Sequence, residues 1–458
     1  MAEKDRSLTV AALIVDLGQN MPDFHPVRTG LMGCCRKSCD ATLSGSRRVV
    51  KMAGMTGQSI EPKPPGDAGV GLYVHVPFCE TKCGYCDFYS VAVKERDTAP
   101  LVARVKRELD RRVREAAAPV RTIFCGGGTP TILPVEQLAG LLESINRAAP
   151  AAFREEFTVE ANPATVDDEK AALLVAMGVS RVSMGAQSFH PSELTTLERL
   201  HSPDDIPPSV ATLRRHGISQ INLDLIFGIP GQTMSTWADS LRRAIDLGPE
   251  HIACYGLTYE PATRLTALRQ VGRIRPCDED LEADMYLYTV DTLAAAGYRQ
   301  YETSNYARPG CECRHNLMYW RNEPYIGVGP SAAGCVGGRR YKNVADVAGY
   351  VRMMDEAGHA EAESEIVEGE TLMLEMILMQ LRLVEGLSIA AFRAGTGEEP
   401  VELFDRDGAL SRLVETGLLA VSDSYIAFTR QGRLVGDWVM KELAGAIGAR
   451  STSLAVLR

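Results

Sequence analysis

The sequence predicts an α/β protein in which a partial (βα)6 barrel of the TIM-like kind precedes a mostly helical, winged-helix-like C-terminal domain. From about residue 70 to residue 300, short apolar segments that favour strands alternate with segments of helical spacing. Such alternation predicts a parallel sheet with helical crossovers, and six units favour an open barrel over the closed eight-unit form. The strand candidates are residues 71–76, 121–126, 155–161, 180–185, 221–228 and 251–259.

The alternation stops after about residue 300. Residues 301–360 predict a loop-rich linker, which contains the sequence HNLMYW at 315–320. Residues 361–458 predict a mostly helical domain, and 408–443 have the order helix, short strand, strand, helix that resembles a winged helix. That segment has no basic recognition face, so we expect it to cover the barrel and not to bind DNA.

Residues 1–68 differ from the rest of the chain. They are rich in Gly and Pro towards their end and show no sustained periodicity, which predicts a disordered or non-native extension with Met52 or Met55 as the true initiator. Cys34, Cys35 and Cys39 lie there, and a metal-binding role for them is the alternative.

Composition narrows the class of protein. The chain has 458 residues, 45% of them hydrophobic and 24% charged, as in a water-soluble globular protein. Its net charge of −10 disfavours nucleic acid and acidic lipid as partners. No apolar run reaches the roughly 18 residues of a membrane span, and the N-terminus does not read as a signal peptide. Twelve cysteines without a secretion signal predict a reducing compartment, so we expect a cytoplasmic protein.

Three cysteines carry the strongest functional signal. Cys79, Cys83 and Cys86 are spaced C-x3-C-x2-C directly after the first predicted strand. Three thiolates can hold three irons of a cubane [4Fe–4S] cluster and leave the fourth iron open, whereas a closed zinc site needs four ligands. The amine and carboxylate of S-adenosylmethionine can chelate that open iron, and electron transfer then yields a 5′-deoxyadenosyl radical. Incidental cysteines or a disulfide are the alternatives.

Polar residues at the ends of the later strands complete a candidate site, because the carboxyl ends of barrel strands meet at one rim. The run Gly126–Pro130 lets backbone groups approach a ligand, although a tight turn would explain it too. Glu160 can accept from ribose hydroxyls or be a solvated rim charge. Arg199 can pair with a carboxylate of the cofactor. Asp224 lies in an apolar run, where a carboxylate needs a partner or ligand.

The motifs GLYVHVPFCETKCGYCDF, FCGGGTPT, FTVEANP, RVSMGAQSF, INLDLIFGIPGQT and HNLMYW together resemble the radical-SAM family of coproporphyrinogen dehydrogenases and HemW-type proteins, from about residue 70 to the C-terminus. The resemblance implies a radical-SAM barrel over 69–300, a HemN-like domain over 361–458, and a cluster held by the three cysteines. Glu198 departs from the family, which more often has Gly before the matching Arg. The residues that the resemblance assigns to S-adenosylmethionine are Tyr73, Gly127, Gly128, Thr129, Glu160, Gln187, Arg199 and Asp224.

Two features favour the HemW-type branch. The dehydrogenase branch carries a further cysteine two residues after the third cluster ligand, where this chain has Phe88. The HemW-type branch is marked by H-N-x-x-Y-W, found here at 315–320. The resemblance therefore implies a heme chaperone that delivers heme to an acceptor hemoprotein and receives electrons from a flavodoxin- or ferredoxin-type donor. The alternatives are an oxygen-independent coproporphyrinogen III dehydrogenase and a HemN-like radical methyltransferase.

Heme binding is expected at residues 311–320. The His315 imidazole can ligate heme iron, and the rings of Tyr319 and Trp320 can pack on a porphyrin face. A neutral imidazole is needed, so binding should weaken as the pH falls through about 6.5. The alternatives are that His315 stabilises a loop while the aromatic rings fill the barrel, or that a thiolate of Cys311 or Cys313 ligates the iron.

Overall fold

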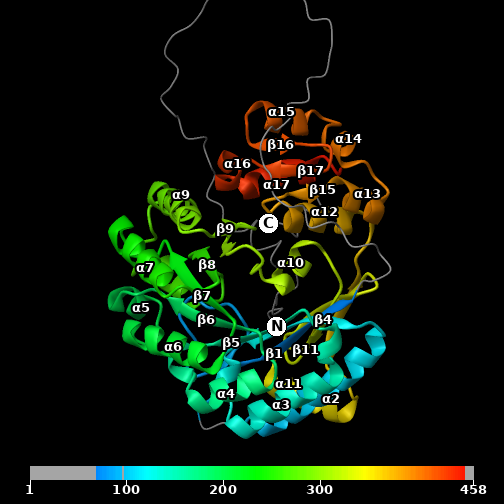
Figure 1. The fold of residues 1–458 in the computed structure, drawn as a ribbon. Helices are drawn as coiled ribbons and strands as arrows, with labels where there is room; N and C mark the ends of the chain where they lie inside the picture. The colour runs from blue at the N-terminus through cyan, green and yellow to red at the C-terminus, as the bar shows by residue number, and fades with distance from the viewer. Residues whose placement is uncertain (1–68, 95–96, 449–458) are drawn as a thin grey trace, which may run out of the picture. The chain divides into compact units, whose positions relative to one another are not determined.

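The computed structural model describes residues 69–94 and 97–448 in two compact units (Figure 1). The larger unit runs to Glu385 and the smaller begins at Gly386. The predicted N-terminal extension, residues 1–68, lies outside the described residues.

The larger unit is built on a twelve-stranded sheet with an open barrel-like core of parallel strands. The six predicted strands are confirmed, and each pairs in parallel with the next. Antiparallel β10 (Asn305–Ala307) lies beside β8, and parallel β11 (Tyr325–Val328) lies beside β1, so these core strands do not close into a ring. The six strands are β1 (Val70–Val76), β4 (Val120–Gly127), β5 (Glu156–Ala161), β6 (Arg181–Gln187), β7 (Gln220–Phe227) and β8 (His251–Gly256).

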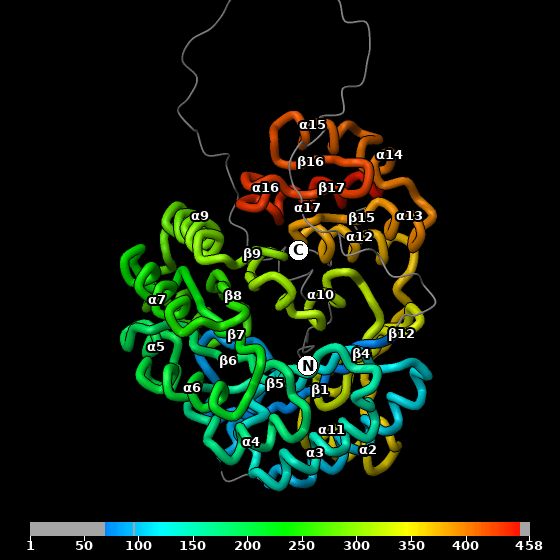
Figure 2. The backbone as a smooth tube through the Cα atoms, in the orientation of Figure 1, coloured from blue at the N-terminus to red at the C-terminus, as the bar shows by residue number. Residues whose placement is uncertain are grey.

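Successive residues along each strand face opposite sides of the sheet, one side towards the covering helices and the other towards the inside of the barrel-like core. In β1, Val70, Leu72, Val74 and Val76 join the large hydrophobic core beneath the covering helices, as a strand period of two requires. The intervening residues of the six strands face the inner side and are largely polar there. The covering helices (Figure 2) are α2 (Ala99–Ala116), α3 (Val135–Ala148), α4 (Asp168–Ala176), α6 (Ile206–His216), α7 (Met234–Asp246) and α9 (Glu279–Ala295), with short α5 (Pro191–Thr196). Short α8 (Arg264–Gln270) instead contacts the loop after β1, where the Leu265 N–H donates to the Gly84 carbonyl at 2.8 Å.

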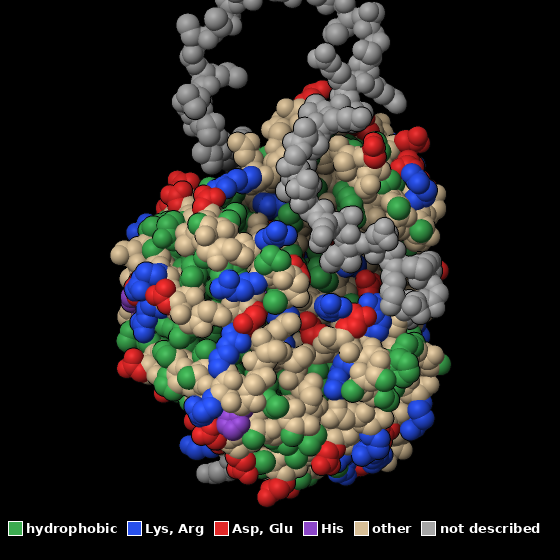
Figure 3. Space-filling model, in the orientation of Figure 1, with side chains coloured by type: hydrophobic (Ala, Val, Ile, Leu, Met, Phe, Trp, Pro, Cys, Tyr) green, Lys and Arg blue, Asp and Glu red, His purple; other side chains and the backbone are tan. Residues whose placement is uncertain are grey.

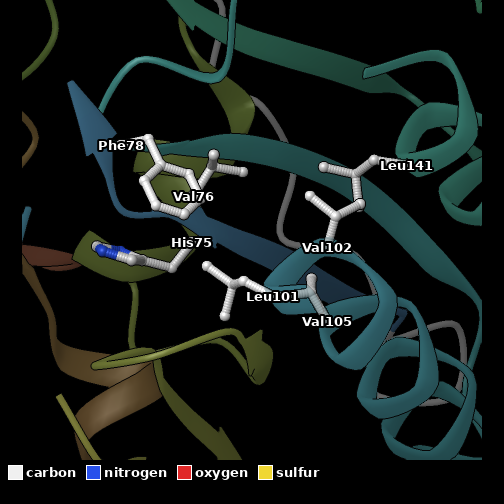
Figure 4. A pocket seen from close by; sticks show the side chains of 7 residues that line it. All are labelled: His75, Val76, Phe78, Leu101, Val102, Val105 and Leu141. Carbon is white, nitrogen blue, oxygen red and sulfur yellow. The ribbon is translucent and has the colours of Figure 1, made fainter. Parts of the chain in front are cut away.

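Packing between β1 and its covering helices leaves one small gap (Figure 4). Its volume is about 10 Å³, which has room for about one water molecule at most. All of its lining residues except His75 are apolar, so it is a packing space and not a ligand site. The lining consists of His75, Val76, Phe78, Leu101, Val102, Val105 and Leu141.

Residues 301–360 contribute more regular structure than a loop-rich linker would. The sheet continues through β9 (Arg299–Gln300), β10, β11, β12 (Ala333–Val336), β13 (Arg339–Asn343) and β14 (Glu361–Ile366). Helices α10 (Arg314–Trp320) and α11 (Val347–Glu356) lie between them in the chain. The strands within 301–360 have only three to five residues, too few for hydrophobic periodicity to reveal them.

The smaller unit is mostly helical, as predicted. Its three-stranded antiparallel sheet has the order β15-β17-β16, where β15 spans Leu387–Ser388, β16 spans Leu419–Val421 and β17 spans Tyr425–Phe428. Helix α12 (Gly369–Gln380) precedes it in the chain. The helices of this unit are α13 (Ile389–Thr396), α14 (Pro400–Phe404), α15 (Ala409–Glu415), α16 (Arg430–Leu434) and α17 (Gly436–Gly445). No helix in the described ranges has both the length and the hydropathy that a bilayer span requires.

Candidate functional site

The three cysteines lie in the loop after β1, next to the carboxyl ends of the parallel strands. Cys79 ends the two-residue strand β2 (Phe78–Cys79), which pairs with β3 (Val91–Ala92). The Cys86 N–H donates to the Cys83 carbonyl at 3.3 Å, which bends the loop between these two residues. The Thr129 N–H donates to the Phe78 carbonyl at 2.7 Å, which holds the loop on the rim where β4 ends at Gly127 and β6 ends at Gln187.

Each thiol is half-buried and none of the nine cysteines in the described ranges forms a disulfide. The Thr129 hydroxyl donates to the Cys79 sulfur at 3.8 Å, and Arg199 Nη1 donates to the Cys83 sulfur at 3.5 Å. Burial, and then the neighbouring Cys83, raises the pKa of the Cys86 thiol to about 12. A thiolate is the form that binds metal, so iron binding would have to offset the free-energy cost of deprotonating this buried thiol.

The donor set fits a cluster better than a single metal ion. Across residues 69–94 and 97–448, no three His, Cys, Asp or Glu side chains converge as a mononuclear site would need. A cubane places each protein ligand on a different iron, so its three cysteines need not meet at one point. Donors from Thr129 and Arg199 to two of the sulfurs suit negatively charged, metal-bound thiolates.

Gly126, Gly127 and Gly128 form a close-packed segment, the glycine ridge, beside the cysteine loop. Gly127 has φ of +93°, and a Cβ there would lie 2.2 Å from His75 Nδ1 and 2.7 Å from the Tyr73 hydroxyl oxygen. A Cβ on Gly128 would meet the backbone of Val76 and Phe78 at 2.6 Å. The ridge thus requires glycine for space and, at Gly127, for backbone conformation.

Two carboxyl groups face the inner side near this ridge. Glu160 Oε2 accepts from the Gly127 N–H at 2.8 Å. Asp224 accepts from Asn222 Nδ2 at 2.7 Å and from the Ser183 hydroxyl at 3.4 Å. Desolvation raises the pKa of Glu160 to about 8 and that of Asp224 to about 6, and the Asp224 charge adds to the rise at Glu160. Glu160 is therefore protonated at neutral pH until a cation or donor approaches it.

Arg199 joins the cysteine loop to the rim. Its Nη2 donates to Asn162 Oδ1 at 2.7 Å and to the Gly185 carbonyl at 2.6 Å, in addition to the Nη1 contact with Cys83. Its Nε is buried and has no hydrogen-bond partner in the structure. An acceptor on a bound ligand would satisfy that nitrogen. Gln187 ends β6 with φ of +62°, a conformation that turns the chain at the rim.

The structure brings together all residues predicted for the cluster and for S-adenosylmethionine, on or just below one rim. Between the cysteine loop, the loop after β5 and the segment before α6 lies a cavity of about 220 Å³. Its lining includes Glu80, Cys83, Asn162, Arg199, His201 and Asp205. Asn162 was expected at this rim from its place in the run FTVEANP, just after a strand end, but it was given no cofactor role.

The residues predicted to bind heme lie elsewhere, on α10. This helix lies on the face of β4 away from α2 and α3 (Figure 2), near the amino ends of the strands. His315 is 1% exposed. Its Nδ1 is 2.8 Å from the Thr122 hydroxyl, its Nε2 is 3.1 Å from the Tyr319 hydroxyl, and its ring stacks on Phe124 at 5.5 Å. Both ring nitrogens therefore have partners.

Burial changes the expected titration of His315. Desolvation lowers the pKa of its imidazole to about 4, although the nearby Glu156 charge opposes this. The pH of about 6.5 expected from the sequence is therefore too high for this conformation, and the imidazole stays neutral through the physiological range. Trp320 Nε1 is buried without a hydrogen-bond partner, and the Arg382 guanidinium lies 5.8 Å from the centre of the Trp320 ring.

The sequence analysis missed the polar groups that hold α10. Glu156 accepts from the backbone N–H groups of Arg314 and His315, both at 3.1 Å, and from Arg181 Nη2 at 3.2 Å. The Cys313 thiol donates to Glu156 at 3.3 Å. Burial, and then the Glu156 charge, raises the pKa of Cys313, so it is a thiol here. Glu156 begins β5 and is far in sequence from the Cys-Arg-His segment at 313–315. No local sequence pattern therefore indicates this contact.

Comparison with known proteins agrees with this arrangement. Residues 73–244 match the radical SAM superfamily, and residues 367–435 match the HemN C-terminal domain. The solved structure of the coproporphyrinogen III oxidase HemN from Escherichia coli, described as a radical SAM enzyme, has a TM-score of 0.70 at 22% identity. It covers 84% of this chain and 91% of its own, which supports the fold. The fold and the rim thus define a radical SAM protein.

Curated relatives specify the family. The chain is 37% identical over 377 residues to the heme chaperone HemW of Bacillus subtilis (strain 168), covering 82% of this chain and 99% of the relative. It is 35% identical over 372 residues to the heme chaperone HemW of Escherichia coli (strain K12), and this match covers 80% of this chain and 95% of the relative. The chain belongs to the HemW family, which confirms the family predicted from its motifs.

Proposed function

We propose that the chain is a heme chaperone that carries a [4Fe–4S] cluster and S-adenosylmethionine on its rim and delivers heme to an acceptor hemoprotein. The observation that carries the proposal is the convergence of Cys79, Cys83 and Cys86 with the glycine ridge, Glu160 and Arg199. Its HemW relatives are named heme chaperones. The bound cofactor, on reductive cleavage, would supply a 5′-deoxyadenosyl radical.

The chain's own residues have distinct tasks in this proposal. The three cysteines hold the cluster, and the donors from Thr129 and Arg199 stabilise the thiolate charge. Glu160, fixed by the Gly127 N–H, accepts from the ribose hydroxyls. The unpaired Arg199 Nε provides a donor for the carboxylate of the cofactor.

Heme is proposed to bind through residues 311–320. His315 can ligate iron only if it gives up its contact with Thr122 or with Tyr319, so α10 would have to shift. The Cys311 thiol is half-buried and is the more accessible of the two thiols in the segment. Heme binding should therefore be slower than the diffusion limit, because its rate is set by the opening of residues 311–320.

A direct experiment separates the chaperone from the decarboxylase. The full chain is reconstituted with iron and sulfide without oxygen, titrated with hemin, and then mixed with coproporphyrinogen III, S-adenosylmethionine and a chemical reductant. We expect cluster formation, about one heme per chain and no protoporphyrinogen IX. Decarboxylation clearly above a control without S-adenosylmethionine would replace the chaperone with an enzyme.

A further inference from the structure

The fold places one arginine on the inner side of the barrel-like core, away from solvent. In the face of the molecule shown in Figure 3, acidic and basic side chains are mixed over the outside. Arg181, in contrast, begins β6 and is 2% exposed. Val182 and Met184 join the helix-facing core, so Arg181 faces the inner side. A guanidinium stays charged in proteins, and its burial is costly unless its N–H groups find acceptors.

Arg181 is held through one of its three nitrogens. Nη2 donates to Glu156 Oε2 at 3.2 Å and to the carbonyls of Cys311 and Glu312 at 2.9 and 3.3 Å. Nε and Nη1 are buried and have no hydrogen-bond partner among the residues that the structure describes. Three N–H groups, one on Nε and two on Nη1, are therefore open to an acceptor.

A second buried donor lies beside Arg181. Thr158 of β5 is the register neighbour of Arg181 in the parallel pairing of β5 with β6. Its chain neighbours Phe157 and Val159 join the helix-facing core, so Thr158 faces the inner side as well. Thr158 is 0% exposed, and its hydroxyl has no partner within 69–94 and 97–448. Buried polar groups in native proteins are normally paired, so an acceptor that reaches both residues would stabilise this part of the core.

Neighbouring polar groups do not compete for these donors. His251 Nδ1 lies 2.6 Å from Asn222 Oδ1, and its Nε2 lies 2.8 Å from the Tyr301 hydroxyl. Since Asn222 Oδ1 can only accept, Nδ1 carries the proton and Nε2 accepts from Tyr301. Desolvation, and then the Arg181 charge, lowers the pKa of His251, so its imidazole is neutral. The Glu156 carboxylate already accepts from four donors.

The open donors define the chemistry of a ligand. A carboxylate accepts from both a guanidinium and a hydroxyl, and its bond to a guanidinium is charge-assisted. The same Arg181 contacts the carbonyls of Cys311 and Glu312, which begin the segment proposed to bind heme. Glu156 also joins Arg181 to the His315 N–H through one carboxylate. A carboxylate on the edge of a porphyrin held by residues 311–320 would therefore lie close to Arg181.

We propose that Arg181 and Thr158 form a carboxylate anchor, which binds a propionate side chain of the porphyrin that the chain carries. The inference rests on the proposed function and deepens it, because it assigns the choice of porphyrin to two residues outside 311–320. No covalent bond forms or breaks. Nη2 keeps its contact with Glu156 while Nη1 or Nε donates to the ligand, so the hold on α10 and the binding of a carboxylate use different N–H groups.

The test compares hemin with hemin dimethyl ester, which has the same iron and ring but no free carboxylate. Both are titrated into the reconstituted full chain in the same detergent solution, and the Soret band gives the two dissociation constants. Thr158→Val removes a hydroxyl without a partner, so it should fold as the wild type does. Arg181→Gln removes the guanidinium. Glu156→Gln is the control, because it weakens the hold on α10 but leaves Arg181 Nε and Nη1 in place.

We expect the wild type to bind hemin at least about tenfold more tightly than the ester, the preference that a charge-assisted hydrogen bond supplies. Thr158→Val should lower that preference by about threefold, and Arg181→Gln should remove it, in each case through weaker binding of hemin. Glu156→Gln should change both affinities by the same factor. Equal affinity of the wild type for both probes, or an unchanged preference in Thr158→Val, would overturn the anchor and leave ordered water only as the partner of these donors.

A third probe separates a porphyrin carboxylate from a small free one. Sodium propionate is added to the apoprotein, and thermal unfolding is followed. We expect no stabilisation that depends on Arg181, because a lone carboxylate gains nothing from a bound ring to offset the cost of association. Stabilisation by propionate that Arg181→Gln abolishes and that hemin does not displace would assign the site to a small carboxylate and overturn the porphyrin anchor.

Iron and sulfide content distinguishes failure of the anchor from failure of the proposed function. Both are measured on the wild type and on every variant before titration. If the wild type assembles its cluster but binds neither hemin nor the ester, the proposed heme function is refuted, and the anchor with it. If hemin binds with no preference over the ester, the anchor alone is refuted.

Discussion

The rim and His315 differ in how their hydrogen-bonding atoms are paired. At the carboxyl rim, two of the three thiols receive only long sulfur contacts of 3.5 and 3.8 Å, and the buried Arg199 Nε has no partner. Near the amino ends, both ring nitrogens of His315 and its backbone N–H have partners. A buried polar atom without a partner is open to a ligand, as Arg199 Nε is, whereas the paired nitrogens of His315 indicate a structural contact. On α10 itself, Trp320 Nε1 is buried without a partner and is open to a ligand too.

This contrast separates the two predicted ligand sites. In the proposed function, the rim would accept a cluster and a cofactor in the conformation that the structure shows. His315 is held by its two hydrogen-bond partners, so ligation of heme iron by its imidazole requires a change of conformation. A residue type that suits a ligand, such as His315, does not by itself distinguish these cases; the partners of its polar atoms do.

The largest expected effect comes from removing a rim thiol. Cys83→Ala should abolish cluster assembly, because three ligands leave no spare cysteine in the loop. Iron and sulfide content after anaerobic reconstitution, with the charge-transfer absorption of the cluster, provides the measurement. Cys254→Ala is the matched control, since that thiol is buried on the helix-facing side of β8. If Cys83→Ala kept its full iron and sulfide content, the rim would not be the cluster site.

The next largest effect should appear at α10 as a loss of stability. His315→Ala removes a buried ring and leaves the Thr122 and Tyr319 hydroxyls without that partner, so we expect a loss of about 2–4 kcal/mol in the free energy of unfolding. Urea denaturation of the apoprotein measures it. His315→Gln, which keeps a polar group there, should recover part of the stability, and cluster content should stay normal in both.

Heme spectra of the same variants decide whether α10 also binds the ligand. If His315 ligates the iron, His315→Ala should shift the Soret band and speed heme loss, and Gln should not rescue the spectrum although it rescues stability. Loss of the wild-type spectrum with unchanged stability would contradict the structural role that its hydrogen bonds indicate. An unchanged spectrum would exclude His315 as the ligand and direct attention to Cys311 and Cys313.

A smaller effect is expected at the glycine ridge. Gly127→Ala should lower stability by about 1–3 kcal/mol and weaken S-adenosylmethionine binding, because φ is +93° and the new Cβ would press on His75. Gly217→Ala is a close control: φ there is +98°, but no atom lies within 4 Å of the position that the new methyl group would take. Both variants incur backbone strain, so a binding defect confined to Gly127→Ala assigns the ridge to the cofactor.

The sequence predicted the barrel well because its six core strands are strand-favouring segments of six to eight residues with regular helical segments between them. It also placed Cys79, Cys83, Cys86, Glu160 and Asp224 at one rim, since parallel strands bring their carboxyl ends together. These inferences depend only on local pattern and on the topology that the pattern implies.

Contacts between distant segments could not be predicted in the same way. The link from Glu156 to α10 spans more than 150 residues, and the chain from Asp224 through Asn222 to His251 depends on which strand residues face inward. The pKa of His315 depends on burial, which a His in a polar, aromatic segment does not reveal. Short strands such as β10 form because neighbouring strands offer an edge, not because of their own sequence.

The last predicted effect is a pH dependence at the rim, through Glu160. Its pKa is about 8 in the folded apoprotein and close to the ordinary value of 4.5 in the unfolded chain. The folded state therefore binds more protons in this interval, and the contribution of Glu160 to stability is full below about pH 4.5 and lost as the pH rises through 8. Glu160→Gln should remove this contribution, so that its stability relative to the wild type improves between pH 6 and pH 8.5 in urea denaturation.

Cofactor binding gives the same residue an independent readout. The positively charged sulfonium of S-adenosylmethionine should favour the Glu160 carboxylate and lower its pKa, so the wild type should release protons on binding near pH 7. Calorimetry in two buffers of different ionisation enthalpy measures that release. Glu160→Gln should bind more weakly and release fewer protons, whereas His315→Gln, a variant at the paired histidine, should release as many as the wild type. Equal release by Glu160→Gln and the wild type would place the titrating group elsewhere, with Asp224, whose pKa is about 6, the next candidate.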